Sequence, residues 1–487
     1  MYLIQIGNIR SNILPALPDS VKRKLDEKLS YELPGAFFAA RWSPWASRRQ
    51  LFAPAGQSFP TGLLHYVEEV LIATGVQYTR TDLRIRPMLG PELPLHNFTL
   101  RDYQQDAVDK AVLKQRGIIK IGTGGGKTNV LTGIVARLNI PTVIFIHKTD
   151  IFYQIIRRLE EALQIPIGKV GDGHCEIEKI TVAMIQTTSR IYDTKKKKSK
   201  KLDPDDTIIL TKAEQIRRMI EDAECVITDE CHHVPSDTFW NVHKRAKNAY
   251  YKFGLSASPW REDNADMLIE AAHAKKIVDL PSSILIERGF LVPPTVYLYQ
   301  FSHIKRDRKD DTYPDVYDID VVDNSLRNQI IVQAAVKAAG EGKTVLIAIT
   351  KVEHGRILEA MLQHIDPTAL FVFGESESQV RQQVLTELDQ HKRRIVICTT
   401  IFGEGIDVPG LDVLINAKAS ASSVDAFQLI GRVLRKTPTK TRAFIVDIFD
   451  RNCKYLGAHA NAREKIYLTE AKYTQIKVNS LDQMEFK

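Results

Sequence analysis

The chain contains little cysteine and no long hydrophobic run, and these two absences exclude several classes of protein. Only five of its 487 residues are cysteine, and no two of them form a CxxC pair, so the sequence favours neither a disulfide framework nor a zinc ribbon. No stretch of about 18 apolar residues is present, and the N-terminal segment lacks the apolar core of a signal peptide. We therefore expect a reduced, cytoplasmic protein that neither crosses a membrane nor is secreted.

What is present is an ordinary globular composition with a small surplus of positive charge. Hydrophobic residues make up 44% and charged residues 26% of the chain, which is enough apolar material for more than one core. A length of 487 residues corresponds to about three domains. Lysine and arginine number 67 against 59 aspartate and glutamate, for a net charge of +8. This balance favours a polyanionic partner without identifying it.

The composition and hydrophobic pattern of the sequence change twice along the chain. A proline-rich N-terminal part gives way near residue 97 to short apolar strands that alternate with helical patterns, and a second such series begins near 325. Alternation of this kind predicts α/β domains with parallel sheets. The fold class expected is two tandem α/β domains behind a small α+β domain. The expected parts are an accessory domain at 1–95, a first α/β domain at 96–290, a linker or arm at 291–324, a second α/β domain at 325–465, and a tail at 466–487.

A glycine-rich loop, IGTGGGKT at 121–128, follows a candidate strand and precedes a helical pattern. Glycines allow backbone N–H groups to surround phosphates, Lys127 would reach the β and γ phosphates, and the Thr128 hydroxyl would ligate Mg²⁺. Ile121 departs from the strict pattern, which asks for glycine there. The alternative is a flexible loop before a helix. The residues predicted to contact ATP here are Thr123, Gly124, Gly125, Gly126, Lys127 and Thr128.

A second acidic site is needed for the metal and for the attacking water, and VITDECHH at 226–233 supplies it. Asp229 and Glu230 follow an apolar run, so both would emerge at the carboxyl edge of a strand. We expect Asp229 to hold Mg²⁺ and Glu230 to act as the base. An acidic loop without chemistry is the alternative. Zinc binding by Cys231 and the two histidines is rejected because adjacent residues seldom converge on one ion, and His232 is instead expected to couple the site through hydrogen bonds.

The Asp-Glu-x-His box and the tandem domains resemble the superfamily 2 helicases and translocases of the DExH type, over about 97–450. The resemblance implies two RecA-like motor domains, with ATP and Mg²⁺ as cofactors. The segment FTLRDYQQDAV at 98–108 is similar to the family's adenine-sensing element. This similarity implies ATP contacts from Arg101 and from Gln104, whose amide offers one donor and one acceptor.

Other segments of the first α/β domain resemble elements that touch nucleic acid or couple it to the nucleotide. IFIHKTDIFYQ and VAMIQTTSR occupy the places of backbone contacts; the resemblance implies DNA contacts from Lys148, Thr149, Gln186 and Thr187. GLSASPWRED at 254–263 is similar to the family's coupling element. The coupling residues it implies are Ser256 and Ser258, and a salt-bridged surface turn is the alternative.

The second α/β domain carries two further similar segments. In TTIFGEGIDVP at 399–409 the resemblance implies that Thr399 contacts the nucleic-acid backbone, while Gly405 and Asp407 approach the ribose of ATP. QLIGRVLRK at 428–436 is similar to the element that delivers arginine to the γ-phosphate. An arginine supplies delocalised charge that stays ionised.

That second segment provides three candidate catalytic residues. Arg432 and Arg435 lie three apart, so a helix would present both on one face as arginine fingers. Gln428 lies one turn earlier and would sense the γ-phosphate or the water. An amphipathic basic helix is the alternative.

Within the superfamily, the segments at 254–263 and 428–436 and the small N-terminal domain are most similar to the UvsW-like recombination helicases of bacteriophages, and more distantly to the XPB and RecG families. This similarity implies a monomeric ATP-dependent DNA helicase. It would unwind or remodel forks and junctions in branch migration, recombination, replication or repair, with 3′-to-5′ polarity. Recombination or replication proteins are expected as further partners, and the host cytoplasm as its location if a phage encodes it. An RNA helicase, the motor of a restriction or transcription-repair complex, and a non-catalytic nucleotide-clamped binding module are the alternatives.

The N-terminal domain mixes arginines with aromatics in GAFFAARWSPWASRRQLF at 35–52. Arginine holds phosphates, and an exposed tryptophan stacks on an unpaired base. The DNA contacts predicted here are Arg41, Trp42, Arg48 and Arg49. In so small a domain the aromatics could instead fill the core, so this alternative stays open.

Overall fold

The computed structural model describes most of the chain. The described residues are 1–32, 48–192, 204–257, 266–303, 312–374, 376, 378–399, 408–420 and 430–487, and within 204–210 only the backbone is described. The chain divides into two compact units that separate near residue 280, and each is described by itself. No described helix is long and apolar enough to cross a membrane.

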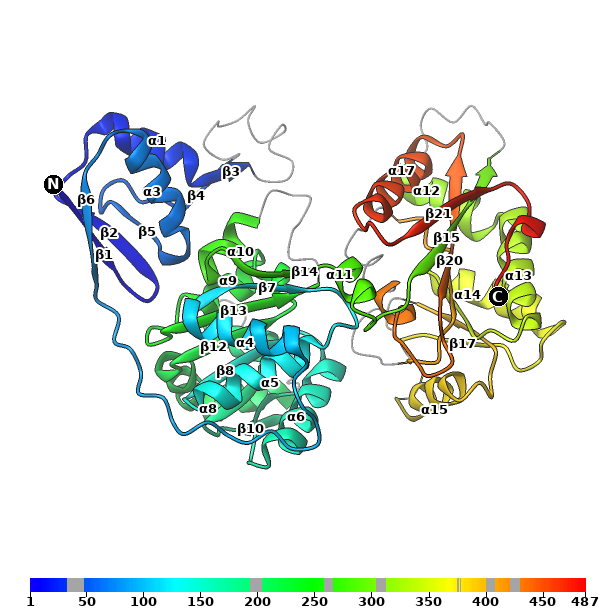
Figure 1. The fold of residues 1–487 in the computed structure, drawn as a ribbon, viewed down its shortest axis with the longest axis horizontal. Coiled ribbons are helices and arrows are strands. Elements are labelled where there is room, and N and C mark those ends of the chain that lie inside the picture. The colour runs from blue at the N-terminus through cyan, green and yellow to red at the C-terminus, as the bar shows by residue number, and fades with distance from the viewer. Residues whose placement is uncertain are drawn as a thin grey trace. The chain divides into compact units, whose positions relative to one another are not determined.

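The N-terminal domain is built on a four-stranded mixed sheet with the order β5-β2-β1-β6 (Figure 1). β1 pairs antiparallel with β2 and parallel with β6. Apolar residues of α1 and α3 close the core with Ile4, Ile13 and Phe59, all without exposed surface. The elements are β1 (Tyr2–Ile6), β2 (Arg10–Leu14), α1 (Asp19–Lys28), β3 (Ser30–Glu32), β4 (Arg48–Gln50), β5 (Ser58–Pro60), η1 (Thr61–Leu63), α3 (Leu64–Ala73) and β6 (Tyr78–Asp82).

An extended segment, 83–101, leads from this domain along the first α/β domain. The backbone N–H of Leu93 bonds to the carbonyl of Ala136, and that of His96 to the carbonyl of Ala162. The first helix of the next domain then begins at Asp102. The boundary that the prolines predicted near residue 95 therefore falls inside this connecting segment.

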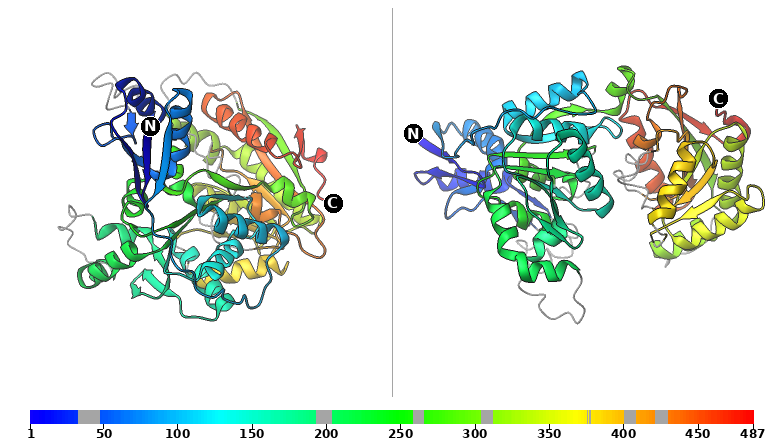
Figure 2. Two further views of the ribbon diagram at one scale, coloured as in Figure 1. Left: turned by 60° about the vertical axis from the view of Figure 1, so that its left-hand side comes forward. Right: turned by 90° about the horizontal axis from the view of Figure 1, so that it is seen from below.

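The first α/β domain contains an eight-stranded sheet with the order β10-β9-β11-β8-β12-β13-β7-β14. The pairs from β9 to β7 along this order are parallel, and helices lie on both faces of the sheet (Figures 1 and 2). Its central strands are short β-branched and aromatic runs, which suit a strand buried on both faces. All residues of β8 (Thr142–Ile146) are buried.

The remaining elements of this domain follow in chain order. They are α4 (Asp102–Lys114), β7 (Arg116–Ile121), α5 (Lys127–Leu138), α6 (Thr149–Leu163), β9 (Gly168–Gly171), β10 (His174–Glu176), β11 (Ile180–Met184), α7 (Ile185–Arg190), α8 (Pro204–Asp222), β12 (Cys225–Asp229), η2 (Cys231–His233), α9 (Asp237–His243), β13 (Tyr251–Ser256), α10 (Asp266–His273) and β14 (Lys276–Leu280).

The second α/β domain has a seven-stranded sheet with the order β17-β18-β16-β19-β20-β15-β21, and its pairs are parallel. The elements are α11 (Ser282–Glu287), β15 (Pro294–Ser302), α12 (Tyr313–Tyr317), the π-helical turn η3 (Asp318–Val322), α13 (Ser325–Gly340), β16 (Val345–Ala348), α14 (Val352–Gln363), β17 (Leu370–Val372), α15 (Ser378–Asp389), β18 (Ile395–Cys398), β19 (Val413–Asn416), β20 (Ala443–Arg451), α17 (Lys454–Leu468), β21 (Thr474–Val478) and η5 (Leu481–Gln483).

Two segments assigned outside the α/β domains belong to this second sheet. The segment 291–324 was expected to be a linker, but β15 within it pairs with β20 along nine residues and with β21 on its other side. The tail expected at 466–487 supplies β21 and Phe486, which has no exposed surface. Both corrections have one cause: β15 covers the edge of β20 that β19 leaves open, and β21 then covers the outer edge of β15. The general prediction of two parallel-sheet α/β domains behind a small α+β domain is confirmed.

A buried charge cluster fixes β15, β20 and α13 to one another. Arg327 donates to both carboxylate oxygens of Asp450, at 3.0 and 3.3 Å, and His303 lies 2.9 Å from the first of these oxygens. Neither Arg327 nor Asp450 has exposed surface. Burial raises the pKa of Asp450, but the charge of Arg327 and the hydrogen bonds from His303 and Arg327 together lower it below its usual value. The carboxylate is therefore ionised and fully paired.

We expect Arg327→Ala to destabilise the second domain by about 3–5 kcal/mol, because it leaves a buried carboxylate without its cation. Urea unfolding followed by circular dichroism should show a transition at lower denaturant. Arg356→Ala, which removes an exposed arginine of α14, is the matched control. Equal midpoints for the two variants would contradict this role of the cluster.

Candidate active site

Five neighbouring strands of the first sheet bring the predicted site residues to one edge. In the order β11-β8-β12-β13-β7, the carboxyl ends of the strands lead to Gln186, to Lys148, to Asp229 and Glu230, to Ser256, and to the glycine loop. Parallel strands present their carboxyl ends on the same side, which is where α/β proteins bind ligands. Residues far apart in the sequence thus form one continuous polar edge.

The glycine loop turns directly from β7 into α5. Gly124 and Gly126 have φ of 84° and 79°, a left-handed conformation that glycine adopts without strain. A Cβ on Gly126 would overlap the Nε2 atom of Gln104, so the loop passes directly against this amide. Lys127 begins α5, and backbone N–H groups of its first turn are directed toward the loop, as anion binding requires.

Lys127 forms a buried ion pair with Glu230. Their side chains are 16% and 8% exposed. Burial opposes both charges, yet the carboxylates of Glu230 and Asp229 raise the pKa of Lys127, while Lys127 and His232 together lower the pKa of Glu230. Both groups are therefore charged at neutral pH.

Glu230 is held from its other side by a serine and a histidine. Ser256 donates to Glu230 Oε2 at 3.1 Å, and the Nδ1 atom of His232 lies 3.1 Å from the Ser256 hydroxyl and 3.3 Å from the carboxylate. Glu230 has φ of 48°, a costly conformation for a residue with a Cβ. The surrounding contacts hold this strained residue with its carboxylate at the end of β12. The structure brings His232 and Ser256 together at Glu230, and their coupling role stays a prediction.

Asp229, the predicted metal ligand, lies half-buried beside this pair. Burial raises the pKa of its carboxyl, Lys127 lowers it and Glu230 raises it, with a net rise. A carboxylate that is costly to ionise in isolation gains free energy from a nearby divalent cation. Its donor oxygens and the Thr128 hydroxyl are ligands of the hard type that Mg²⁺ prefers.

The two residues expected near adenine form the start of α4. The backbone N–H of Arg101 donates to Gln104 Oε1 at 3.0 Å, and the Arg101 guanidinium donates to the Tyr103 hydroxyl at 3.1 Å. Gln104 is 1% exposed. The structure therefore places Gln104 against the glycine loop, and its pairing with adenine stays a prediction.

The predicted DNA contacts of the first α/β domain converge, but they are not equally accessible. β8 and β11 are paired in register up to Ile146 and Met184, so the residues that follow are neighbours. Gln186 donates to the carbonyl of His147 at 2.7 Å. The Thr187 side chain is fully buried, so in this structure it supports α7 rather than facing a ligand.

Two predicted DNA contacts of this edge are partly exposed, and the chain also places His147 here. Lys148 caps α6, and the Thr149 hydroxyl lies 4.0 Å from Met184 Sδ. Sequence reasoning missed His147, whose ring lies 4.0 Å from that of His233. The only signal was its position directly after a buried strand.

In the second domain the predicted arginines differ from the expected arrangement. The described helical turn that carries Arg432 ends at Val433, and Arg435 instead pairs with Leu291 as an isolated β-bridge. The two arginines are therefore not on one face of a helix. Arg432 is 8% exposed, and burial lowers the pKa of Arg435 to about 10, which leaves it charged at neutral pH. Thr399 follows β18 and is also buried.

Two of the three predicted N-terminal arginines, Arg48 and Arg49, lie on β4, which pairs antiparallel with β3. Arg49 pairs with Tyr31 and Arg48 with Glu32, and the Arg48 guanidinium donates to the Ser30 hydroxyl at 2.7 Å. Arg48 is exposed. The predicted site residues that lie outside the described part of the chain are Arg41, Trp42, Ser258, Gly405, Asp407 and Gln428.

Two family models match this chain. One, described as the type III restriction enzyme res subunit, matches residues 97–261, and the other, the helicase conserved C-terminal domain, matches residues 326–437. Together they match more than half of the chain, including the glycine loop, the acidic box and the arginine segment. The chain belongs to the superfamily 2 helicases. This helicase is ATP-dependent and is therefore an ATPase, as the sequence predicted.

The helicase has low sequence identity to the similar proteins found. It is 23% identical over 370 residues to the DNA 3'-5' translocase XPB2 of Sulfurisphaera tokodaii, covering 69% of this chain and 79% of the relative. It is 23% identical over 396 residues to the ATP-dependent DNA helicase uvsW of Enterobacteria phage T4, covering 77% and 71%. The structure of the type ISP restriction-modification enzyme LlaBIII bound to DNA aligns with a TM-score of 0.56 at 14% identity, over 86% of this chain and 34% of that one. This likeness shows the RecA-like fold.

We expect Ser256→Ala to lower ATP turnover roughly 10- to 100-fold, because a hydrogen bond to a charged group contributes about 1.5–3 kcal/mol. Steady-state ATPase assays measure this effect. Ser256→Thr keeps the hydroxyl and should retain most of the rate. Full activity of Ser256→Ala would remove the serine from the network around Glu230.

Proposed function

We propose that this helicase is a DNA translocase that unwinds or remodels branched DNA, such as forks and four-way junctions, in recombination, replication or repair. The observation that carries the proposal is the continuous polar edge of the first sheet, where Gln186 and Lys148 adjoin the ATP residues. The contacts of a DNA strand bound at this edge would shift when the side chain of Glu230 changes its partner. The names of the two distant relatives, a DNA 3'-5' translocase and a DNA helicase, both favour DNA, and the first favours a 3′-to-5′ direction.

The accessory domain supports the preference for branched structures. Its exposed Arg48 would hold a phosphate of a second DNA arm while the motor domains hold the first. A motor that holds one strand needs such a second site to recognise a branch. Arg41, Trp42 and Arg49 remain candidate contacts of the same arm.

In the proposed ATPase cycle, Lys127 exchanges one partner for another. Its ammonium group is paired with Glu230 in this structure, and the phosphates of incoming ATP compete for the same charge. Once Lys127 turns to the phosphates, Glu230 is released to orient and deprotonate the attacking water. Ser256 and His232 keep the carboxylate in position during this exchange.

Thr128 and Asp229 would hold Mg²⁺, which neutralises charge on the β and γ phosphates when bound. Arg432 and Arg435 are proposed to stabilise the charge that develops on the departing γ-phosphate. Planar guanidinium groups that stay ionised suit this task.

We expect Arg432→Ala to lower the turnover of ATP by about 10³-fold or more while nucleotide affinity changes little, because the charge is needed in the transition state. Turnover and binding of a fluorescent ATP analogue measure the two effects. Lys436→Ala, at an exposed position of the same segment, is the control. Weaker binding with an unchanged turnover would exclude Arg432 from the transition-state role.

The choice of nucleic acid is tested by ATPase stimulation. With forked DNA, four-way junctions, single-stranded DNA, linear duplex and RNA offered at equal nucleotide concentration, we expect the forked and four-way substrates to stimulate most. Greatest stimulation by RNA would replace the proposal by an RNA helicase.

A second candidate, the motor of a restriction or transcription-repair complex, is favoured by the description of the first family model and by the fold of LlaBIII. Such a motor translocates on linear duplex. Equal stimulation by linear and branched duplex, without strand separation, would favour this candidate over branch remodelling.

A further inference from the structure

Helix α10 contacts both the acidic box of the ATP site and the N-terminal domain. On one side it packs against β13 and against η2, the turn that begins directly after Glu230. On another side it packs against η1 of the N-terminal domain. A single helix of eight residues thus touches the element that holds the catalytic carboxylate and the domain proposed to bind a DNA arm.

The C-terminal end of α10 reaches beneath the acidic box. A Cβ on Gly254 would be 2.5 Å from the His273 ring and 2.8 Å from Cys231 Cβ, so this glycine allows His273 to lie against the box. The His273 ring also lies 4.8 Å from that of His243. His243 in turn hydrogen-bonds at 2.9 Å to Thr228, the residue before Asp229. A shift of the box would therefore press on His273.

The N-terminal domain packs on the middle of α10, where Gly62 contacts the backbone of Glu270 and Ala271; we call this contact the seat. A Cβ on Gly62 would overlap the carbonyl oxygen of Glu270 and would be 2.7 Å from that of Ala271. Backbone therefore packs directly on backbone. On the other side, the Thr61 hydroxyl donates to the carbonyl of Gly7 at 2.7 Å and lies 2.9 Å from the Ser11 hydroxyl, so η1 is fixed to the sheet of its own domain.

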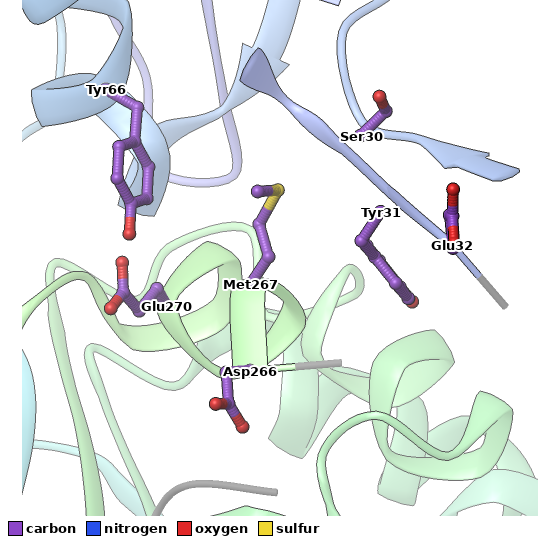
Figure 3. A pocket seen from close by; sticks show the side chains of 7 residues that line it. All are labelled: Ser30, Tyr31, Glu32, Tyr66, Asp266, Met267 and Glu270. Atoms are coloured by element: carbon purple, nitrogen blue, oxygen red, sulfur yellow. The ribbon is translucent and has the colours of Figure 1, made fainter. Parts of the chain in front are cut away.

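Glu270 adds polar contacts at this seat. Its carboxylate lies 3.2 Å from His65 Nε2 and accepts a hydrogen bond from the Tyr66 hydroxyl; Figure 3 shows the Tyr66 and Glu270 side chains directed toward each other. Burial, followed by the charge of Glu270, raises the pKa of Tyr66 to about 12. Tyr66 therefore remains a hydrogen-bond donor across the physiological range.

Next to this seat, a pocket of about 580 Å³ lies between α10 and the part of the N-terminal domain that includes β3. In Figure 3 the strand that bears Tyr31 and Glu32 stands apart from the helix that bears Asp266 and Met267. Among the described residues, the backbone of η1 packs directly on α10 at Gly62, and the pocket opens beside this contact. Contact on one side beside an open space leaves room for the domain to tilt on the helix.

We propose that α10 transmits the nucleotide state of the Asp229–Glu230 box to the N-terminal domain, so that ATP binding changes how tightly this domain docks. Any rearrangement of Lys127 and Glu230 moves η2 and β12, and these carry it to His273 and α10. The seat at Gly62 and Glu270 then receives the shift. The proposal requires only that the chain binds ATP, so it does not depend on which nucleic acid is the substrate.

Hydrogen–deuterium exchange of the full chain, with and without Mg²⁺ and a non-hydrolysable ATP analogue, tests this coupling. In the wild type we expect exchange in α3 to change about fivefold or more, the lower range of typical coupling between sites. Gly62→Ala should abolish this response. Because coupling is reciprocal, the same substitution should shift the dissociation constant of the analogue by the same factor.

The matched control is Gly56→Ala, because a Cβ at Gly56 has only the Ser58 hydroxyl near it, at 3.9 Å. It should retain both the exchange response and the affinity of the wild type. Tyr66→Phe, which keeps the ring and removes the donor to Glu270, should show the same changes as Gly62→Ala at smaller size and serves if Gly62→Ala fails to fold. A wild-type α3 that does not respond to the analogue, or a full response in Tyr66→Phe and Gly62→Ala, overturns the proposal.

Discussion

The buried ion pair of Lys127 and Glu230 is the constraint on which the site depends. Opposite charges with little exposed surface are costly to bury, and removing one partner of such a pair costs about 3–5 kcal/mol. The sheet order makes the pair possible, because β13 lies between β7 and β12 and adds Ser256 from the middle strand. The strained backbone at Glu230 is tolerated for the same reason. The pair is thus kept where ATP phosphates can replace one of its members.

The same box is connected to more distant parts of the first unit. Thr228 contacts His243, His243 lies beside His273, and α10 supports the N-terminal domain at Gly62. These contacts run through packed strands and helices, which shift as rigid bodies rather than deform. A change of partner at Lys127 could therefore reach the accessory domain without any flexible linker, and this would allow one ATP cycle to act on two arms of a DNA substrate.

Sequence alone predicted the parts whose signals are local. The β-branched run at 142–146 coincides with β8, and the loop and box motifs identified Lys127, Asp229 and Glu230. It failed where structure depends on distant partners. β15 follows Pro293, begins at Pro294 and precedes a charged run, and β21 is mostly exposed. Neither segment therefore resembles a core strand until its pairing in the sheet is known. Arg435 was predicted to lie on a helix, but in the structure it forms a β-bridge with Leu291. Gly62 gave no signal, because its constraint is a backbone oxygen from another domain.

We propose that Glu230 is the base of ATP hydrolysis and that its ion pair with Lys127 occupies it until ATP binds. The most direct measurement is a single-turnover experiment with Glu230→Gln, in which bound and hydrolysed ATP are followed separately. We expect this variant to bind ATP as tightly as the wild type or more tightly, because Lys127 loses its competing carboxylate. We expect hydrolysis to be slowed by about 10²-fold or more through loss of the base. Hydrolysis at the wild-type rate, or a loss of ATP binding with normal hydrolysis of what is bound, would contradict this proposal.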